Sequence, residues 1–305
     1  MTGKQWNRRD VLGAGLALGV SPGFATTSMS GQMAKKPVPS SGELLPIIGL
    51  GTYNVFDVES SPEEVGIRKK IVETLLASGG SLLDTSPMYN RSERIIGDVI
   101  QKGVDRKQLF LATKVWTDGQ ASGEKQIKRS AELMQTDVID LMQVHNLRDT
   151  AIHMKTIRDW QASGRIRYSG LTHYTAGAQA MLAREMEQFK PDFIQINYSL
   201  GERDAENRLL PMARDLGVAV LVNRPFQAGR LFRALSGKQL PDWALEFAAS
   251  WGQFFLKFIV SHPAVTCAIP ATSKPHHMID NLGAGIGVLP DEATRKRMAD
   301  YFESI

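Results

Sequence analysis

The sequence predicts an α/β fold, a single (β/α)8 TIM barrel, on three observations. From Leu44 onward, short apolar segments alternate with longer segments of helical pattern. Eight such apolar segments follow one another without interruption, which favours closure into a barrel over an open sheet. The chain of 305 residues has no linker and no break in composition. Barrels of this class commonly take about 250 residues as one unit, so one domain is expected.

The expected strands are short, apolar and regularly spaced. In chain order they cover residues 47–51, 81–84, 109–114, 138–145, 166–171, 193–197, 218–222 and 265–269. The clearest helical patterns between them cover residues 63–77, 123–135, 176–189 and 243–260. Because strands and helices alternate strictly, we expect a parallel sheet with right-handed crossovers. Residues 36–46 are expected to form a small hairpin over the bottom of the barrel, and a last helix should follow Pro290.

The N-terminal 34 residues are expected to be a twin-arginine-type signal peptide and linker, which leaves residues 35–305 for the barrel. Arg8 and Arg9 precede a glycine-rich apolar run over residues 11–20, and small residues follow it. That run is too short to span a hydrocarbon core of about 30 Å as a helix. This interpretation implies contact with the twin-arginine export machinery, a periplasmic location and no stable membrane anchor. The alternative is a disordered or amphipathic tail with a chance arginine pair.

Charge and cysteine content exclude several classes of protein. The net charge is +4, and three bases against one acid before residue 35 supply +2 of it. The remainder is too weak to indicate nucleic-acid binding, and no basic stripe with interleaved aromatic residues is present. Cys267 is the only cysteine, so the chain can form no internal disulfide and has no cysteine for a lipid anchor after the signal.

Ionisable side chains end three consecutive predicted strands. Asp84, Lys114 and His145 are these residues, and Tyr89 follows in the loop after Asp84. The carboxyl ends of all barrel strands open on one mouth, where ionisable residues are typical of catalysis. A neighbour could satisfy any one of them structurally, but four on adjacent strands indicate a site.

These four side chains suit the reduction of a carbonyl group. The proton donor would be Tyr89, whose ordinary pKa near 10 a neighbouring Lys114 ammonium is expected to lower. Asp84 would compensate and orient the lysine, since an isolated buried ammonium is costly. His145 would donate a hydrogen bond to the carbonyl oxygen. Tyr89 would then act as general acid in reduction and as base in oxidation.

Four motifs resemble those of the aldo-keto reductase family. They are Leu-Asp-Thr-Ser-Pro-Met-Tyr at 83–89, Ala-Thr-Lys-Val at 112–115, Val-His-Asn at 144–146 and Ile-Pro-Ala-Thr-Ser at 269–273. They occur in the family's order, and the resemblance covers about residues 42–290. It implies that Asp84, Tyr89, Lys114 and His145 are a catalytic tetrad. It also implies an NAD(P)H-dependent oxidoreductase that converts small aldehydes or ketones to alcohols by hydride transfer.

The same resemblance implies an extended nicotinamide cofactor at the barrel mouth, bound without a Rossmann loop. The positions that match the family's cofactor site are Gly51, Thr52, Thr172, His173, Gln195, Asn223, Arg224, Pro225, Phe226, Thr272, Ser273, Lys274, His277, Asp280 and Asn281. Gln195 is similar to the residue that hydrogen-bonds the carboxamide. Residues 270–281 resemble the adenosine-phosphate loop, in which a helix N-terminus offers free N–H groups to a phosphate. Lys274 and His277 favour NADP(H), with NAD(H) as the alternative.

The chain departs from the family's pattern at three places. Thr172-His173 replaces a common Ser-Asn pair, and Asn223 replaces a tyrosine that stacks on the nicotinamide. His277 corresponds to a phosphate-binding arginine of many members. Tyr174 and Phe226 are candidates for replacement stacking, and Arg224 and Arg230 are candidates for holding a phosphate.

Two other functions compete with a reductase. The first is a cofactor-binding sensor or auxiliary barrel protein with little turnover. The second is a metal-dependent barrel hydrolase, but no His, Asp and Glu ligands cluster at the strand ends, and His276-His277 belongs to the loop that resembles the adenosine-phosphate loop. We therefore expect no metal.

Overall fold

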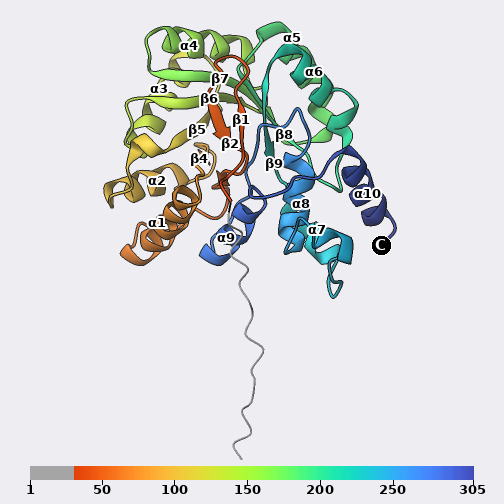
Figure 1. Cartoon of the computed structure of the whole chain (residues 1–305). Helices are drawn as coiled ribbons and strands as arrows, with labels where there is room; N and C mark the ends of the chain where they lie inside the picture. The colour runs from red at the N-terminus through yellow and green to blue at the C-terminus, as the bar shows by residue number, and fades with distance from the viewer. Residues whose placement is uncertain (1–30) are drawn as a thin grey trace, which may run out of the picture.

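Eight parallel strands form the centre of the protein in a computed structural model that describes residues 31–305 (Figure 1). They are β3 (Leu50–Gly51), β4 (Leu82–Asp84), β5 (Phe110–Val115), β6 (Ile139–His145), β7 (Ile166–His173), β8 (Phe193–Asn197), β9 (Ala219–Asn223) and β10 (Cys267–Ala268). Each pairs with its neighbours in chain order. The first and last meet, because Gly49 N–H donates to the Ala268 carbonyl at 2.9 Å and Gly51 N–H to that of Pro270 at 3.1 Å. The predicted (β/α)8 TIM barrel is confirmed.

Helices surround the strands on the outside (Figure 1). They are α1 (Pro62–Ala77), α2 (Ser92–Gln101), α3 (Gln120–Met134), α4 (Thr150–Ala162), α5 (Gln179–Phe189), α6 (Leu209–Leu216), α7 (Arg230–Ala234), α8 (Trp251–Val260), α9 (Pro275–Gly283) and α10 (Glu292–Glu303). Local sequence sets their starts. Ser61 caps α1 by accepting the Glu64 N–H at 3.2 Å, and Asp291 caps the expected last helix, α10, by accepting the Thr294 N–H at 2.8 Å.

The helix expected over residues 243–260 is wrong in its first half. Trp243 lies in a short 3-10 turn, and α8 begins only at Trp251. Ser250 starts it by accepting the Gln253 N–H at 3.1 Å, while the Gln253 side chain accepts the Ala249 N–H at 3.0 Å. The upstream aromatic residues fold back onto α8, since the Trp243 ring lies 5.9 Å from that of Phe254. Their helical spacing therefore reflects tertiary packing.

The predicted hairpin closes the N-terminal end of the barrel. It consists of β1 (Lys35–Pro37) and β2 (Leu44–Pro46), which pair in antiparallel fashion. Val38 and Leu45 are buried in the same cluster as the barrel-interior residues Phe110, Tyr168 and Phe193. An apolar plug therefore fills the end opposite the catalytic mouth.

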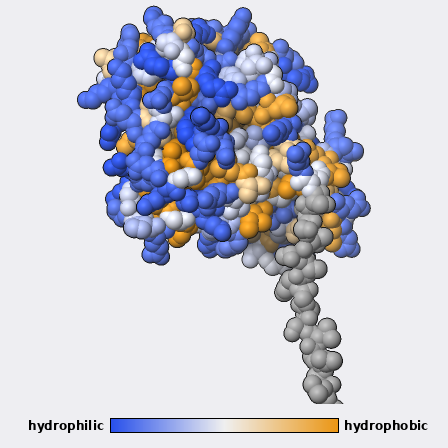
Figure 2. Space-filling view, turned by 60° about the vertical axis from the view of Figure 1, so that its left-hand side comes forward, coloured by the Kyte–Doolittle hydropathy of each residue, from blue (hydrophilic) through white to orange (hydrophobic). Residues whose placement is uncertain are grey.

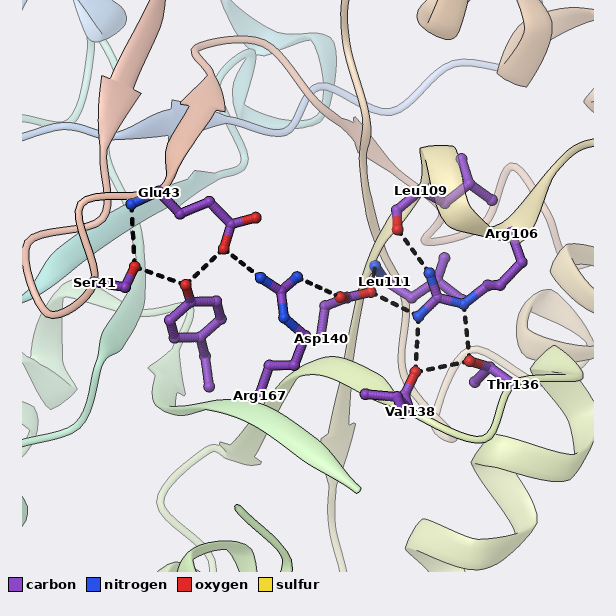
Figure 3. A network of polar contacts seen from close by, with 10 residues as sticks. Ser41, Glu43, Arg106, Leu109, Leu111, Thr136, Val138, Asp140 and Arg167 are labelled. Carbon is purple, nitrogen blue, oxygen red and sulfur yellow. Dashed lines mark hydrogen bonds and ion pairs between the residues drawn. The ribbon is translucent and has the colours of Figure 1, made fainter. Parts of the chain in front are cut away.

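A polar network joins this hairpin to the strands (Figure 3). Glu43 accepts hydrogen bonds from the Tyr168 hydroxyl, at 2.6 Å, and from Arg167. Arg167 also donates to the buried Asp140 at 2.7 Å, and Arg106 donates to the same carboxylate at 2.7 Å. Asp140 additionally accepts a backbone N–H of β5 at 2.8 Å. The network satisfies a carboxylate buried between two strands, at the end of the barrel where residues serve stability.

The expected signal peptide lies almost wholly in residues 1–30, outside the described residues. Two residues of the expected linker belong to the folded body, because Met33 is buried and the Ala34 N–H donates to the Gly285 carbonyl at 2.8 Å. Within residues 31–305, no helix is both long and apolar enough to cross a membrane. The face in Figure 2 carries hydrophobic residues interspersed among hydrophilic ones.

Replacing Asp140 with Ala should destabilise the barrel. The change leaves a buried N–H without an acceptor, removes the carboxylate partner of Arg106 and leaves Arg167 with Glu43 alone, although both arginines are partly solvated. We expect a loss of about 2–3 kcal/mol in the free energy of unfolding. Urea unfolding measures it, with Lys155→Ala, which removes an exposed ion pair, as the control. Equal stability of the two variants would contradict this role.

Candidate active site

A polar layer lies above the apolar interior of the barrel, at the carboxyl ends of the strands. Side chains of a strand alternate between its two faces. Asp84 therefore shares a face with Leu82, and Lys114 shares one with Ala112, both of which belong to the interior cluster. Gln143 and His145, two residues apart on β6, share one face in the same way. The ionisable strand ends predicted from sequence thus converge on the barrel mouth.

The Asp84–Lys114 ion pair is the centre of this layer. Lys114 Nζ donates to Asp84 Oδ2 at 2.7 Å and to the Thr85 carbonyl at 2.7 Å. Both side chains are almost fully buried. Burial lowers the pKa of Lys114, but the Asp84 carboxylate and the Tyr89 phenol raise it by more, and the net shift is upward. The lysine is therefore an ammonium.

Two glutamine side chains complete the shell of Asp84. The second carboxylate oxygen accepts hydrogen bonds from Gln143 Nε2 at 3.1 Å and from Gln195 Nε2 at 2.7 Å. Gly170 makes room for this arrangement, since a Cβ there would lie 2.8 Å from the Gln143 side chain. Sequence analysis did not single out Gln143, although its place two residues before His145 puts it on the same face of β6. Asp84 is thus held by side chains from three other strands, β5, β6 and β8.

Tyr89 lies beside the ammonium in the loop after β4. Lys114 Nζ is 5.0 Å from the centroid of its ring. Burial raises the pKa of the Tyr89 phenol above its ordinary value, and the Lys114 charge, which lowers it, offsets this only in part. The expectation that the lysine lowers the pKa of Tyr89 is therefore right about the influence of Lys114 and wrong about the net shift. The phenol is protonated at neutral pH, as a proton donor must be.

His145 faces the same space from the end of β6. Its ring lies 6.1 Å from that of Tyr89, centroid to centroid, at an interplanar angle of 86°. Burial, the Lys114 charge and His173 lower the pKa of His145 to about 3. The imidazole is therefore neutral at physiological pH. A neutral imidazole and a protonated phenol can both donate a hydrogen bond to one acceptor atom between them.

These groups lie at an open cleft of about 1160 Å³. Asp84, Tyr89 and His145 line it. Twelve of the positions assigned to the cofactor also line it, namely Gly51, Thr52, Thr172, Gln195, Asn223, Arg224, Pro225, Phe226, Thr272, His277, Asp280 and Asn281. One groove therefore joins Asp84, Tyr89 and His145 to the loop over residues 270–281, and Lys114 lies buried behind Asp84 and Tyr89.

Three assigned positions and one candidate lie outside this lining. His173 stacks on Tyr174, with ring centroids 5.6 Å apart, and accepts the Thr175 N–H at 3.3 Å. Ser273 and Lys274 are exposed, and Lys274 forms the N-cap of α9. Arg230 donates to Gln227 at 2.9 Å. Burial and the His276 and Lys274 side chains lower the pKa of His277, which makes it a weaker partner for an anion than a charged residue.

The residues around Gln195 suit the carboxamide of a nicotinamide ring. Asn223 Oδ1 lines the cleft side of β9, is buried, and has no hydrogen-bond partner among the described residues. Gln195 Oε1 accepts only long hydrogen bonds, at 3.4 Å, from Thr172 and from Asn223. A carboxamide brings two N–H donors and one acceptor, which this group of side chains would satisfy. Tyr174 and Phe226, the candidates for stacking, both line the cleft.

Sequence analysis missed the part of the cleft formed by α7 and α8. Phe232, Trp251 and Gly252 line the groove. Ser250, at the start of α8, donates to the Asp280 carboxylate at 2.8 Å, and a Cβ on Gly252 would lie 2.8 Å from the same carboxylate. The helix predicted from residue 243 placed these residues inside a helix and so hid the capped N-terminus that lines the cleft.

Metal chemistry finds no support in the described part of the chain. No group of three or more His, Cys, Asp or Glu side chains within residues 31–305 is arranged to hold an ion. His276 and His277 face each other at 4.4 Å between ring centroids, without a carboxylate or a thiolate that completes a ligand set.

Comparison with known proteins shows the family to which this chain is related. Residues 47–297 match the model of the aldo/keto reductase family. The chain is 30% identical over 222 residues to aldo-keto reductase YhdN of Bacillus subtilis, a match that covers 65% of this chain and 62% of that relative. It is 28% identical over 244 residues to the NADH-specific methylglyoxal reductase of Escherichia coli, covering 70% and 73%. An aldo-keto reductase from Klebsiella pneumoniae in complex with NADPH superimposes with a TM-score of 0.73 at 24% identity, covering 88% and 96%.

The buried neutral His145 should make stability depend on pH. Its pKa is lower in the folded than in the unfolded protein, so this contribution to stability is complete above pH 6.5 and is lost as the pH falls toward 3. Between pH 6.5 and pH 5 we expect the wild type to lose about 2 kcal/mol through this residue. Urea unfolding of His145→Gln should show that much less loss, whereas His276→Gln, at an exposed histidine, should match the wild type. An unchanged loss in His145→Gln would contradict the assignment.

Proposed function

The chain belongs to the aldo/keto reductase family, and on that premise we propose that it is an NAD(P)H-dependent oxidoreductase that reduces aldehydes or ketones to alcohols. One observation carries the proposal. The Tyr89 phenol, the Lys114 ammonium, the Asp84 carboxylate and the His145 imidazole meet at a cleft of about 1160 Å³ that the loop over residues 270–281 also lines.

Each of the four side chains has its own role in the reduction of a carbonyl group. A bound nicotinamide would supply the hydride to the carbonyl carbon. The neutral His145 imidazole donates a hydrogen bond to the carbonyl oxygen and so stabilises the charge that develops there. Tyr89 Oη gives up its proton to that oxygen as the alcohol forms. The Lys114 ammonium then stabilises the resulting phenolate, and Asp84 keeps the ammonium in place.

The cleft also suggests how the cofactor lies. Thr172, Gln195 and Asn223 would hold the carboxamide, and the loop over residues 270–281 would hold the adenosine end. Arg224 is exposed at the cleft, 5.7 Å from the Tyr174 ring, and pairs with no carboxylate of residues 31–305. Its charge suits the diphosphate that NADH and NADPH share. Lys274 and His277 are the remaining candidates for a 2′-phosphate, and we propose NADP(H) as the preferred cofactor.

The substrate is proposed to be a small carbonyl compound. The Escherichia coli relative is a reductase of methylglyoxal, a small ketoaldehyde. The cleft is open, and the exposed side chains of Tyr53, Met88 and Tyr174 lie along it. Such a rim admits aldehydes of different sizes, so a reactive aromatic aldehyde serves as a general test substrate.

Replacing Tyr89 with Phe should abolish most of the activity and leave cofactor binding intact. The change removes only the hydroxyl group, and the loss of a general acid typically costs about 10²–10⁴ in rate. The experiment follows the nicotinamide absorbance during reduction of an aromatic aldehyde by NADPH. A rate within a few-fold of the wild type, with cofactor bound, would leave only a cofactor-binding sensor with little turnover.

Substitutions of Lys274 and Arg224 should affect the binding of NADPH and NADH differently. Loss of a charge-assisted hydrogen bond costs about 1.5–3 kcal/mol, or about ten- to a hundredfold in affinity. We expect Lys274→Ala to weaken NADPH by that factor and to leave NADH unchanged, whereas Arg224→Gln should weaken both cofactors equally. Fluorescence titration with each reduced cofactor measures both effects. Equal or tighter binding of NADH by the wild type would show that the loop does not recognise a 2′-phosphate.

We also propose that the chain is exported already folded, through the twin-arginine machinery, to the periplasm. The support is the sequence pattern of Arg8 and Arg9 before a glycine-rich apolar run. Replacing both arginines with lysine should retain a full-length precursor in the cytoplasm, as cell fractionation would detect. Undiminished delivery to the periplasm would contradict the export proposal without affecting the proposed reductase activity.

A further inference from the structure

The loop between Asp84 and Tyr89 contains a buried hydroxyl group with two contacts. Ser86 Oγ lies 3.1 Å from His145 Nδ1 and accepts the Met88 N–H at 3.2 Å. The residue is fully buried. Among residues 31–305, these are the only hydrogen bonds of this hydroxyl group. Ser86 therefore contacts His145 on the side of the ring that carries Nδ1.

The two tautomers of a neutral imidazole leave Ser86 in different states. If Nδ1 carries the proton, it donates to Ser86 Oγ, and the serine O–H has no acceptor in a buried site. If Nε2 carries the proton, the Met88 N–H donates to Ser86 Oγ, the serine O–H donates to Nδ1, and neither of these buried donors is left without an acceptor. Because an unpaired buried donor costs about 1–3 kcal/mol, the second arrangement is favoured.

The other ring nitrogen faces the cleft. His145 lines the cleft, and Nε2 hydrogen-bonds to no side chain or backbone group of the described residues. An Nε2–H group is thus free to donate to an atom placed between His145 and Tyr89. In the opposite tautomer Nε2 would present a lone pair to that atom and repel a carbonyl oxygen.

We propose that Ser86 is a positioning residue that fixes His145 as its Nε2–H tautomer. The proposal rests on the proposed reductase function for its effect on rate. The hydrogen bonds run in one direction, from the Met88 N–H through the Ser86 hydroxyl to the imidazole, so each donor polarises the next. The backbone of the loop that carries Tyr89 thereby also sets the proton on His145, and the two groups that contact the carbonyl oxygen are prepared together.

Histidine-selective ¹⁵N NMR of the full chain tests the tautomer without any turnover. Two-bond ¹H–¹⁵N correlations distinguish a protonated from an unprotonated ring nitrogen. The signals of His145 are those that disappear in His145→Gln. At neutral pH we expect a single Nε2–H pattern in the wild type. An Nδ1–H pattern, or an even mixture of the two, would overturn the proposal, whether or not the protein reduces aldehydes.

Two variants test the consequence for the rate. Ser86→Ala should shift His145 toward a mixture of tautomers and lower kcat about threefold to tenfold, as expected for a hydrogen bond of about 0.7–1.4 kcal/mol. Its affinity for NADPH should not change. Ser86→Thr keeps the hydroxyl group and should retain the wild-type tautomer and most of the rate.

A matched control is Ser169→Ala. Ser169 lies on β7, and its buried hydroxyl group donates to Asp192 at 2.8 Å. It should leave both the tautomer and kcat as in the wild type. A Ser86→Ala protein with an unchanged tautomer would contradict the proposal, whatever its kcat. Inactivity of the wild type toward every aldehyde tested would instead contradict the proposed function and leave the tautomer result standing.

Discussion

The buried ion pair of Asp84 and Lys114 is the interaction on which the rest of the site depends. An ammonium in a barrel interior is stable only if a carboxylate and further hydrogen bonds replace the water that it loses. The structure supplies them through one oxygen of Asp84 and the Thr85 carbonyl, while two glutamines hold the other carboxylate oxygen. The pair places a fixed positive charge beside Tyr89 and contributes to keeping His145 neutral.

The barrel places the buried ion pair and most of the apolar packing at opposite ends. Its N-terminal end is filled by apolar side chains and closed by the hairpin of β1 and β2, where Asp140 and Glu43 are paired with arginines. Its C-terminal end carries the Asp84–Lys114 ion pair, the Asn223 oxygen that has no hydrogen-bond partner within residues 31–305, and the open cleft. Stability thus comes mostly from one end and chemistry from the other, as parallel strands in a closed barrel allow.

Much of the fold and of the site was predictable because both follow from strand periodicity. The alternation of apolar and helical segments predicted all eight strands close to their positions, and ionisable residues at strand ends predicted that Asp84, Lys114 and His145 meet at one mouth of the barrel. The start of α8 was not predictable, because Trp243 has helical spacing and yet folds back onto Phe254. The contact of Ser86 with His145 depends on a loop after β4 and the end of β6, which meet only in the folded barrel. The net direction of the pKa shift of Tyr89 depends on burial, which the sequence does not reveal.

The proposed division of roles requires that Lys114 acts electrostatically on Tyr89 across the barrel mouth. The most direct test is the pKa of Tyr89, measured by NMR of ¹³C-labelled tyrosine in the wild type and in Lys114→Met. The lysine charge lowers that pKa and burial raises it, so removing the charge should move the pKa further upward. An unchanged or lower pKa in Lys114→Met would show that the ammonium does not tune the phenol, and the proposed division of roles would fail.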